Sequence, residues 1–213
     1  MAKLAGILLA AGESTRMGSS KALLPWLSDE PLVSFQTRCL YSAGFDPIIV
    51  VLGHDADLIK IDVPQLPGVT IIRNHSYQQG RSTSVISGVK SLPSDIDAVT
   101  ILNVDSPRTP DMLAQLRKTY EQSAPLLMVL SYQGTPGHPW MFSKQLVAEI
   151  LLITEEGRGL REVEKRYESE QYLVESSSPL ALANINTASE YAAVLKLAQK
   201  NPRRGDNFTW AQK

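Results

Sequence analysis

Short runs of apolar residues recur along the chain and alternate with segments in which apolar residues lie three or four positions apart. The apolar runs cover residues 4–9, 48–52, 69–72, 98–104 and 126–130. Each run predicts a strand, and the continuous β-branched run at residues 48–52 is typical of a central strand buried on both faces of a mostly parallel sheet. Helical spacing lies between them, at residues 31–44, 82–92 and 110–122. This order predicts βαβ units and therefore an α/β fold.

The later part of the chain is less regular. Two short extended pieces around a Pro/Gly turn at residues 132–142 predict a hairpin, and a charged helix is expected to open within 155–161. Beyond residue 200 the apolar period disappears. A chain of 213 residues that is 43% hydrophobic can bury one sizeable core. We therefore expect a single domain over residues 1–200 and a polar C-terminal tail over 201–213.

Composition narrows the range of partners. The formal net charge is −1, so the chain has no global basic field to hold a nucleic acid, and any polyanion is bound locally. The one cysteine, Cys39, lies on the apolar face of an expected helix, which favours an inert core thiol and a reducing cytosol. The N-terminal stretch predicts neither secretion nor membrane insertion. We expect a cytoplasmic protein that binds small molecules, without nucleic-acid or membrane partners.

After the first apolar run, the chain becomes small, polar and basic from Ala10 to Lys21. Gly12 and Gly18 in this loop can adopt positive φ. Successive backbone N–H groups in such a loop form a nest for anions, and Arg16 and Lys21 add two positive charges. The spacing excludes a Walker loop, which needs a glycine directly before Lys-Ser/Thr, and a dinucleotide fingerprint, whose second glycine is replaced by serine. The loop predicts a polyphosphate ligand.

The segment from Leu8 to Pro25 resembles the signature of the nucleotidyltransferases of the molybdenum-cofactor group. That signature reads Leu-x-Ala-Gly/Ala-Gly-x-Ser-x-Arg-Met-Gly-x-x-Lys-x-Leu-Leu-Pro, and it is matched here throughout. The resemblance implies a three-layer α/β/α, Rossmann-like nucleotidyltransferase fold with a mostly parallel sheet. It also implies transfer of a nucleoside monophosphate from an NTP to an acceptor phosphate, with release of pyrophosphate. The loop residues that it assigns to the nucleotide are Leu9, Ala10, Ala11, Gly12, Arg16 and Lys21.

Residues 74–88 form a second polar segment. Ser82, Thr83 and Ser84 predict a helix N-cap before the apolar positions that follow. A helix N-terminus at the cleft would offer N–H groups to a ligand, whereas the alternative is a well-capped helix without a ligand, and spacing alone does not separate the two. The resemblance implies that four residues of this segment face the nucleotide base: Asn74, Gly80, Ser84 and Gly88.

Asp105 is the candidate metal ligand. It ends a buried run, where open α/β sheets bind ligands, although an Asp at a strand end is often only a turn residue. The resemblance implies that Asp105 acts in catalysis with Arg16 and Lys21. It also pairs Asp105 with Asn186 as ligands of Mg²⁺. Many members have Asp at the position of Asn186, and because an amide oxygen carries no charge, weaker metal binding is expected.

The acceptor side of the site is less defined. In the resembling proteins a Gly-His-Pro segment and a Gly-x-Arg segment lie there, which points to His138 and Arg158. His138 would touch a substrate phosphate or a pterin, and the alternative is a histidine that orders its turn. For Arg158 the alternative is a solvated helix face.

Two tripeptides, Ala10-Ala11-Gly12 and Gly137-His138-Pro139, resemble the cytidylyl branch of the group. This branch joins CTP and a molybdopterin-type cofactor, which implies Mg²⁺ as cofactor and an acceptor molybdoenzyme as downstream partner. A sugar- or polyol-phosphate nucleotidyltransferase is the alternative within the same chemistry. A non-catalytic nucleotide-binding or molybdenum-cofactor delivery protein is the alternative from another class. It is motivated by Ser106, where cytidylyl members usually have Gln, and by Asn186.

Overall fold

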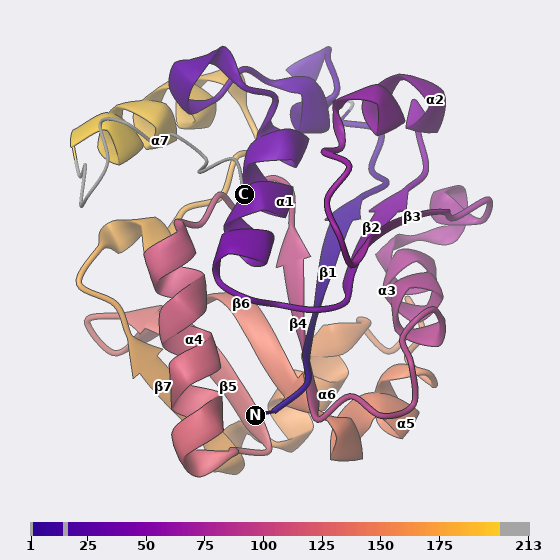
Figure 1. The fold of residues 1–213 in the computed structure, drawn as a ribbon, viewed down its shortest axis with the longest axis vertical. Helices are drawn as coiled ribbons and strands as arrows, with labels where there is room; N and C mark the ends of the chain where they lie inside the picture. The colour runs from indigo at the N-terminus through magenta and orange to yellow at the C-terminus, as the bar shows by residue number, and fades with distance from the viewer. Residues whose placement is uncertain (1, 15–16, 201–213) are drawn as a thin grey trace.

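The computed structural model of the chain describes residues 2–14 and 17–200. Its middle layer is a sheet of seven strands in the order β3-β2-β1-β4-β6-β5-β7 (Figure 1). The strands are β1 (Leu4–Ala10), β2 (Ile48–Leu52), β3 (Val69–Arg73), β4 (Ala98–Asn103), β5 (Leu127–Tyr132), β6 (Thr135–Ser143) and β7 (Gln171–Glu175). Neighbouring strands pair in parallel except where β6 meets β4 and β5. The predicted α/β fold with a mostly parallel sheet is confirmed.

Helices cover both faces of this sheet. They are α1 (Leu32–Ser42), α2 (Ala56–Ile59), α3 (Arg81–Lys90), α4 (Pro110–Ser123), α5 (Val147–Ile150), α6 (Leu160–Arg166) and α7 (Ala188–Lys200). Side chains of α1, α4 and α7 belong to one core cluster, and side chains of α3, α5 and α6 belong to another. Figure 1 shows α1 and α4 on one side of the sheet and α3, α5 and α6 on the other. The result is the expected three-layer arrangement.

The first strand, β1, contributes to both cores because successive side chains of a strand point to opposite faces. Leu4 and Leu8 pack in the cluster that contains α1 and α4, whereas Ile7 and Leu9 pack in the cluster that contains α3. All of β1 is buried. A strand buried on both faces therefore accounts for the continuous apolar run.

The position of β1 between β2 and β4 decides which loops meet. Leu9 lies opposite Asn103 of β4, and Ala10 lies opposite Leu52 of β2. Because these strands are parallel, the segments that follow them leave from the same edge of the sheet. The polar loop after β1 and the segment after β4 therefore emerge side by side.

The hairpin lies earlier in the chain than the sequence predicts. Its turn consists of Gln133 and Gly134, both with positive φ (50° and 73°), and it joins β5 to β6. Residues 135–143 form one strand rather than two short pieces. The apolar pattern did not indicate β7, which pairs with β5 at the edge of the sheet and leaves most of its side chains accessible to solvent.

The start of α3 also differs from the prediction. The helix begins at Arg81, so the predicted cap by Ser82, Thr83 and Ser84 is wrong. Gly80 is the N-cap residue, and its φ of 117° is a conformation that other residues rarely adopt. The backbone N–H of Ser82 donates to the carboxylate of Glu155, 73 residues away in the sequence. A distant side chain thus replaces the local cap.

Three expectations drawn from composition can be compared with the structure. Cys39 is fully buried, and burial, followed by the charge of Glu30, raises the pKa of its thiol well above the ordinary value, as an inert core thiol requires. No helix in the described part of the chain is both long and apolar enough to cross a bilayer. The expected tail at 201–213 lies outside the described residues, so the boundary at residue 200 stays a prediction.

The close approach of α3 to the sheet generates a testable prediction. A Cβ added at Gly88 would lie 2.8 Å from Cγ2 of Ile7 and 3.1 Å from Cγ2 of Val51, both on buried strands. Gly88→Ala should therefore lower the free energy of unfolding by about 1–3 kcal/mol, although alanine is the better helix former. Urea denaturation measures this change, with Ser87→Ala on the same helix as control. A Gly88→Ala variant as stable as the parent would mean that α3 lies farther from the sheet.

Candidate active site

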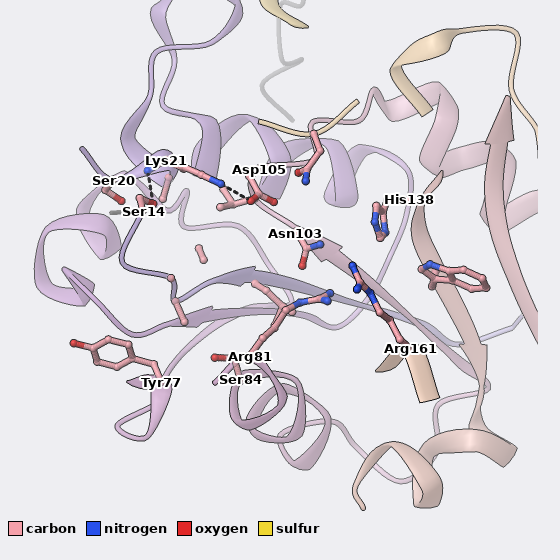
Figure 2. Close-up of a pocket in the computed structure, with 18 of the residues that line it drawn as sticks. Ser14, Ser20, Lys21, Tyr77, Arg81, Ser84, Asn103, Asp105, His138 and Arg161 are labelled. Carbon is pink, nitrogen blue, oxygen red and sulfur yellow. Dashed lines mark hydrogen bonds and ion pairs between the residues drawn. The ribbon is translucent and has the colours of Figure 1, made fainter. Parts of the chain in front are cut away.

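A cleft of about 610 Å³ opens at the carboxyl ends of β1 and β4 (Figure 2). This volume is in the range of small-molecule binding sites. The predicted site residues that line the cleft are Leu9, Ala10, Ala11, Gly12, Lys21, Ser84, Asp105 and His138. The predicted residues that do not line it are Asn74, Gly80, Gly88, Arg158 and Asn186. Arg16 lies outside the described residues.

Lys21 and Asp105 meet at one end of the cleft. The Lys21 Nζ donates to Asp105 Oδ2 at 2.8 Å and to Asn186 Oδ1 at 3.2 Å. The side chains of Lys21 and Asp105 are 12% and 24% exposed. Such a partly sheltered pair is screened less by salt than a pair on the open surface. The sheet brings together an ammonium and a carboxylate that are 84 residues apart in the sequence.

Hydrogen bonds hold the loop after β1 at both ends. The carbonyl of Ala11 accepts from the backbone N–H of His54, which follows β2, at 3.1 Å. The backbone N–H of Lys21 donates to Ser14 Oγ at 3.0 Å. Between these points, a Cβ added at Gly12 would have no atom within 4 Å, so the backbone there is open to a ligand. The loop therefore presents backbone groups and the Lys21 ammonium to the same space.

Oxygen atoms suited to a hard cation lie in and around the pair formed by Lys21 and Asp105. They belong to the carboxylate of Asp105 and the amides of Asn186 and Asn184, and Asn184 Oδ1 also accepts from Ser106 Oγ at 3.1 Å. Within the described residues, no group of three or more His, Cys, Asp or Glu side chains is placed to hold a metal ion. One carboxylate and neutral amides fit Mg²⁺ when phosphate oxygens supply the remaining ligands.

The segment after β3 supports α3 from behind the cleft. The buried Asn74 donates from Nδ2 to Thr83 Oγ1 at 2.8 Å and to Ser84 Oγ at 2.9 Å, and its Oδ1 accepts from the Ser76 N–H at 2.9 Å. Gly80 forms the N-cap described above, and Gly88 packs on the sheet. Of the four residues expected at the base, only Ser84 lines the cleft.

A buried arginine, Arg108, which was not among the predicted site residues, holds together the end of the cleft at His138. The Arg108 side chain is fully buried and donates to the carbonyl oxygens of Pro107, His138, Ala181 and Ala183 at 2.6–3.1 Å. Burial lowers the pKa of Arg108 to about 9, while the charge of Asp105 opposes this shift. The guanidinium thus joins the segment after β4, β6 and the chain before α7. No local pattern reveals this role, because three of the four carbonyls come from distant segments.

His138 lines the cleft next to Arg108. Burial first, and then the charges of Arg108, Arg81 and Arg161, lower the pKa of His138 to about 4. The imidazole is therefore neutral near pH 7, and it offers a hydrogen bond rather than a charge. Arg158, the other residue predicted at the acceptor side, is exposed and does not line the cleft.

Two further arginines and a glutamate line this part of the cleft. Arg81 begins α3, and Arg161 and Glu164 belong to α6. Burial raises the pKa of Glu164, and the charges of both arginines oppose that shift. Arg81, Arg161 and Glu164 were not among the predicted site residues, because helical spacing alone does not show which face meets a cleft formed by other elements.

Comparison with known proteins identifies relatives of this chain. A family model described as MobA-like NTP transferase domain matches residues 6–171. The molybdenum cofactor cytidylyltransferase of Escherichia coli (strain K12) is 30% identical over 146 residues, which cover 68% of this chain and 72% of that protein. The probable molybdenum cofactor guanylyltransferase of Bacillus mycoides (strain KBAB4) is 31% identical over 134 residues, which cover 60% of this chain and 64% of that protein.

The bifunctional protein GlmU of Anaeromyxobacter sp. (strain Fw109-5) is 36% identical over 107 residues, 49% of this chain. The matched part is 22% of that protein, so the chain spans about a fifth of the GlmU relative. Among solved structures, a nucleotidyl transferase from Methanothermobacter thermautotroptrophicus aligns with a TM-score of 0.77 at 23% identity, covering 93% of this chain and 99% of that one. Rv0371c of Mycobacterium tuberculosis H37Rv, in complex with manganese, aligns with a TM-score of 0.69 at 22% identity, covering 92% and 98%. Both structures share the fold.

The environment of His138 generates a testable prediction. Its Hε1 resonance, followed by NMR from pH 3 to pH 8 (about the range in which histidines titrate), should titrate with a pKa of about 4. Arg81→Gln removes one of the lowering charges and should raise that pKa. The unfolded chain takes up this proton near the ordinary histidine pKa, whereas the folded chain takes it up only at about pH 4. His138 therefore makes the fold less stable as the pH falls from the first value to the second. An ordinary histidine pKa in the parent, or no change in Arg81→Gln, would contradict the placement of these groups.

Proposed function

Because the chain belongs to the MobA-like NTP transferase family, we propose that it transfers a nucleoside monophosphate from an NTP to the phosphate of an acceptor. The observation that carries the proposal is the contact between Lys21 and Asp105 at the open loop after β1. A cation that can turn to a phosphate and a carboxylate that can hold a metal ion stand at one end of a cleft of suitable size. Transfer of a phosphoryl group requires such a cation and such a metal ligand near the phosphates.

The proposed reaction needs no protein nucleophile. An oxygen of the acceptor phosphate attacks the α-phosphorus in line, the new P–O bond forms, and the bond to the β-phosphate oxygen breaks so that pyrophosphate leaves. Catalysis then consists of positioning and of neutralising charge. Lys21, together with Arg16 as expected from the signature, acts on the charge that gathers on the leaving pyrophosphate. The open backbone near Gly12 binds the phosphates, and the loop around Leu9, Ala10 and Ala11 lies against the nucleoside.

We assign the metal position to Asp105 with Asn186, and Mg²⁺ as the ion. When bound, it would offset the negative charge of the nucleotide phosphates. The manganese complex of the mycobacterial relative supports a divalent ion in this fold. Since Asp105 is paired with Lys21, the carboxylate becomes available when the ammonium turns toward a phosphate. We therefore expect the cation to bind together with the nucleotide.

For the substrates, we propose CTP and a molybdopterin-type cofactor. The cytidylyltransferase and guanylyltransferase relatives match at nearly equal identity, so the comparison does not decide between the bases. The proposal depends on Ala11 in the loop and on the Gly-His-Pro segment, of which His138 lines the cleft. A sugar- or polyol-phosphate acceptor is the alternative, and a non-catalytic nucleotide-binding or delivery protein is the alternative of another class.

The direct test is release of pyrophosphate with Mg²⁺, each of CTP and GTP in turn, and molybdopterin cofactor as acceptor. The proposal expects pyrophosphate with CTP and much less with GTP. A preference for GTP would remove the cytidylyl assignment and keep the chemistry. Pyrophosphate only with sugar or polyol phosphates would replace the acceptor. Nucleotide binding without pyrophosphate from any acceptor would favour the non-catalytic alternative.

Substitution of Lys21 tests whether its charge serves nucleotide binding or the chemical step. Its charge matters most when negative charge gathers on the leaving group, so Lys21→Ala should lower turnover by about 10²-fold or more, with a smaller effect on nucleotide affinity. Turnover and CTP affinity are measured for this variant and for Lys90→Ala, an exposed lysine at the end of α3. If turnover survives in Lys21→Ala and only the Michaelis constant rises, Lys21 is a binding residue.

The neutral ligand Asn186 gives a second prediction. Asn186→Asp adds a carboxylate beside Asp105 and should raise Mg²⁺ affinity severalfold in the absence of nucleotide. Because Lys21 Nζ lies 3.2 Å from Asn186 Oδ1, the ammonium offsets part of that gain, and the same change in a Lys21→Ala background should have the larger effect. Calorimetric titration with MgCl₂ measures both. Unchanged affinity in both backgrounds would mean that the second ligand lies elsewhere, with Asn184 as the next candidate.

A further inference from the structure

Arg81 and Arg161 stand together on the wall of the cleft that lies away from Lys21. Arg81 is the first residue of α3, and Arg161 is the second residue of α6. Figure 2 shows the two guanidinium groups close together, both directed toward Asn103 and His138, while Lys21 and Asp105 occupy the other end of the cleft. Helices α3 and α6, on the same side of the sheet, thus place two guanidinium groups next to each other at this wall.

Neither guanidinium has a close partner in residues 2–14 and 17–200, where the structure gives it no hydrogen bond and no ion pair. Several other arginines in the described part of the chain are engaged. Arg73, Arg117 and Arg166 each contact a carboxylate, and Arg108 donates to four carbonyls. The donors of Arg81 and Arg161 are therefore available to a ligand that enters the cleft.

The charge balance of this wall includes carboxylates as well as the two arginines. Arginine stays charged in proteins, and His138 is neutral near pH 7 because its pKa is about 4. Desolvation is the main cause that lowers the pKa of Arg81, and the charge of Arg161 adds to it. The charges of Glu164, Asp105 and Glu155 oppose the lowering of the Arg81 pKa. Asp105 is paired with Lys21, and Glu155 accepts from the backbone N–H of Ser82. Two guanidinium groups that line one wall of the cleft without a carboxylate of the described residues in hydrogen-bond contact indicate a site for an anion.

We propose that Arg81 and Arg161 form the subsite for the phosphate monoester of the acceptor; this inference rests on the proposed function. In-line attack requires the incoming phosphate to approach the α-phosphorus from the side opposite the pyrophosphate. Lys21 and the loop after β1 hold the triphosphate at one end, so the nucleophile needs its own anion site at the other. The planar fork of a guanidinium matches phosphate oxygens with two donors at once.

The test is calorimetric binding of two probes, phenyl phosphate and inorganic phosphate, to the full chain without nucleotide, followed by CTP with Mg²⁺ in a separate titration. The variants are Arg81→Gln, Arg161→Gln and Arg161→Lys. The matched control is Lys165→Gln, which removes one positive charge from an exposed position of the same helix outside the cleft. Circular dichroism establishes that each variant is folded.

We expect each glutamine variant to bind both probes about tenfold more weakly or worse, the scale of a lost hydrogen bond to a charged group. Arg161→Lys should retain part of the affinity, Lys165→Gln should match the parent, and CTP affinity should change little in all of them. If both glutamine variants bind phosphate as tightly as the parent does, the subsite is overturned. It is also overturned if the parent binds neither probe. Equal losses for CTP and phenyl phosphate would instead assign the pair to the triphosphate.

The outcome is separable from that of the proposed function. If the glutamine variants lose the probes but no acceptor yields pyrophosphate, the anion subsite stands and the transfer reaction fails. If pyrophosphate release depends on Lys21 while the probes bind equally to parent and variants, the reaction stands and the subsite fails.

Discussion

The parallel pairing of β1 with β4 at the centre of the sheet is the constraint on which the site depends. It places Leu9 opposite Asn103, so the loop after β1 and the segment after β4 leave the sheet at the same point. Without that register, Lys21 and Asp105 would not meet at 2.8 Å. The strands themselves supply little of the chemistry: they are buried on both faces, and the reactive groups lie at their ends.

A second layer of contacts fixes the groups around this pair. Arg108 joins the segment after β4 to β6 and to the chain before α7 through carbonyl oxygens. The backbone N–H of Ile185 also donates to the carbonyl of Asp105 at 2.8 Å. Burying a guanidinium is unfavourable unless its donors are satisfied, and here the carbonyls compensate for the lost water. The backbone at His138 and at Ala183 is therefore held by a buried cation that does not itself line the cleft.

Most of the sheet could be predicted from apolar runs, because strands buried on both faces leave a continuous local signal. β3 is also largely exposed but keeps an apolar, β-branched run, whereas β7 is a short apolar stretch between Gln171 and Glu175 and left no such signal. The loop and Asp105 were recognisable because small residues and charges follow buried runs directly. The arginine pair was not, because the sequence does not reveal that the first turns of α3 and α6 share one wall. Asn74 looked like a ligand residue, but its amide is used to hold α3.

The central claim is that Lys21 and Asp105 act as one unit on the triphosphate and its metal ion. A double-mutant cycle on the rate of pyrophosphate release tests it most directly, with Lys21→Met, Asp105→Asn and the double variant compared with the parent under saturating CTP, Mg²⁺ and acceptor. Groups that act as a unit are not additive. The account predicts that each single change removes most of the rate and that the double variant is no slower than the slower single variant. Independent, multiplying losses, or full activity in either single variant, would contradict it.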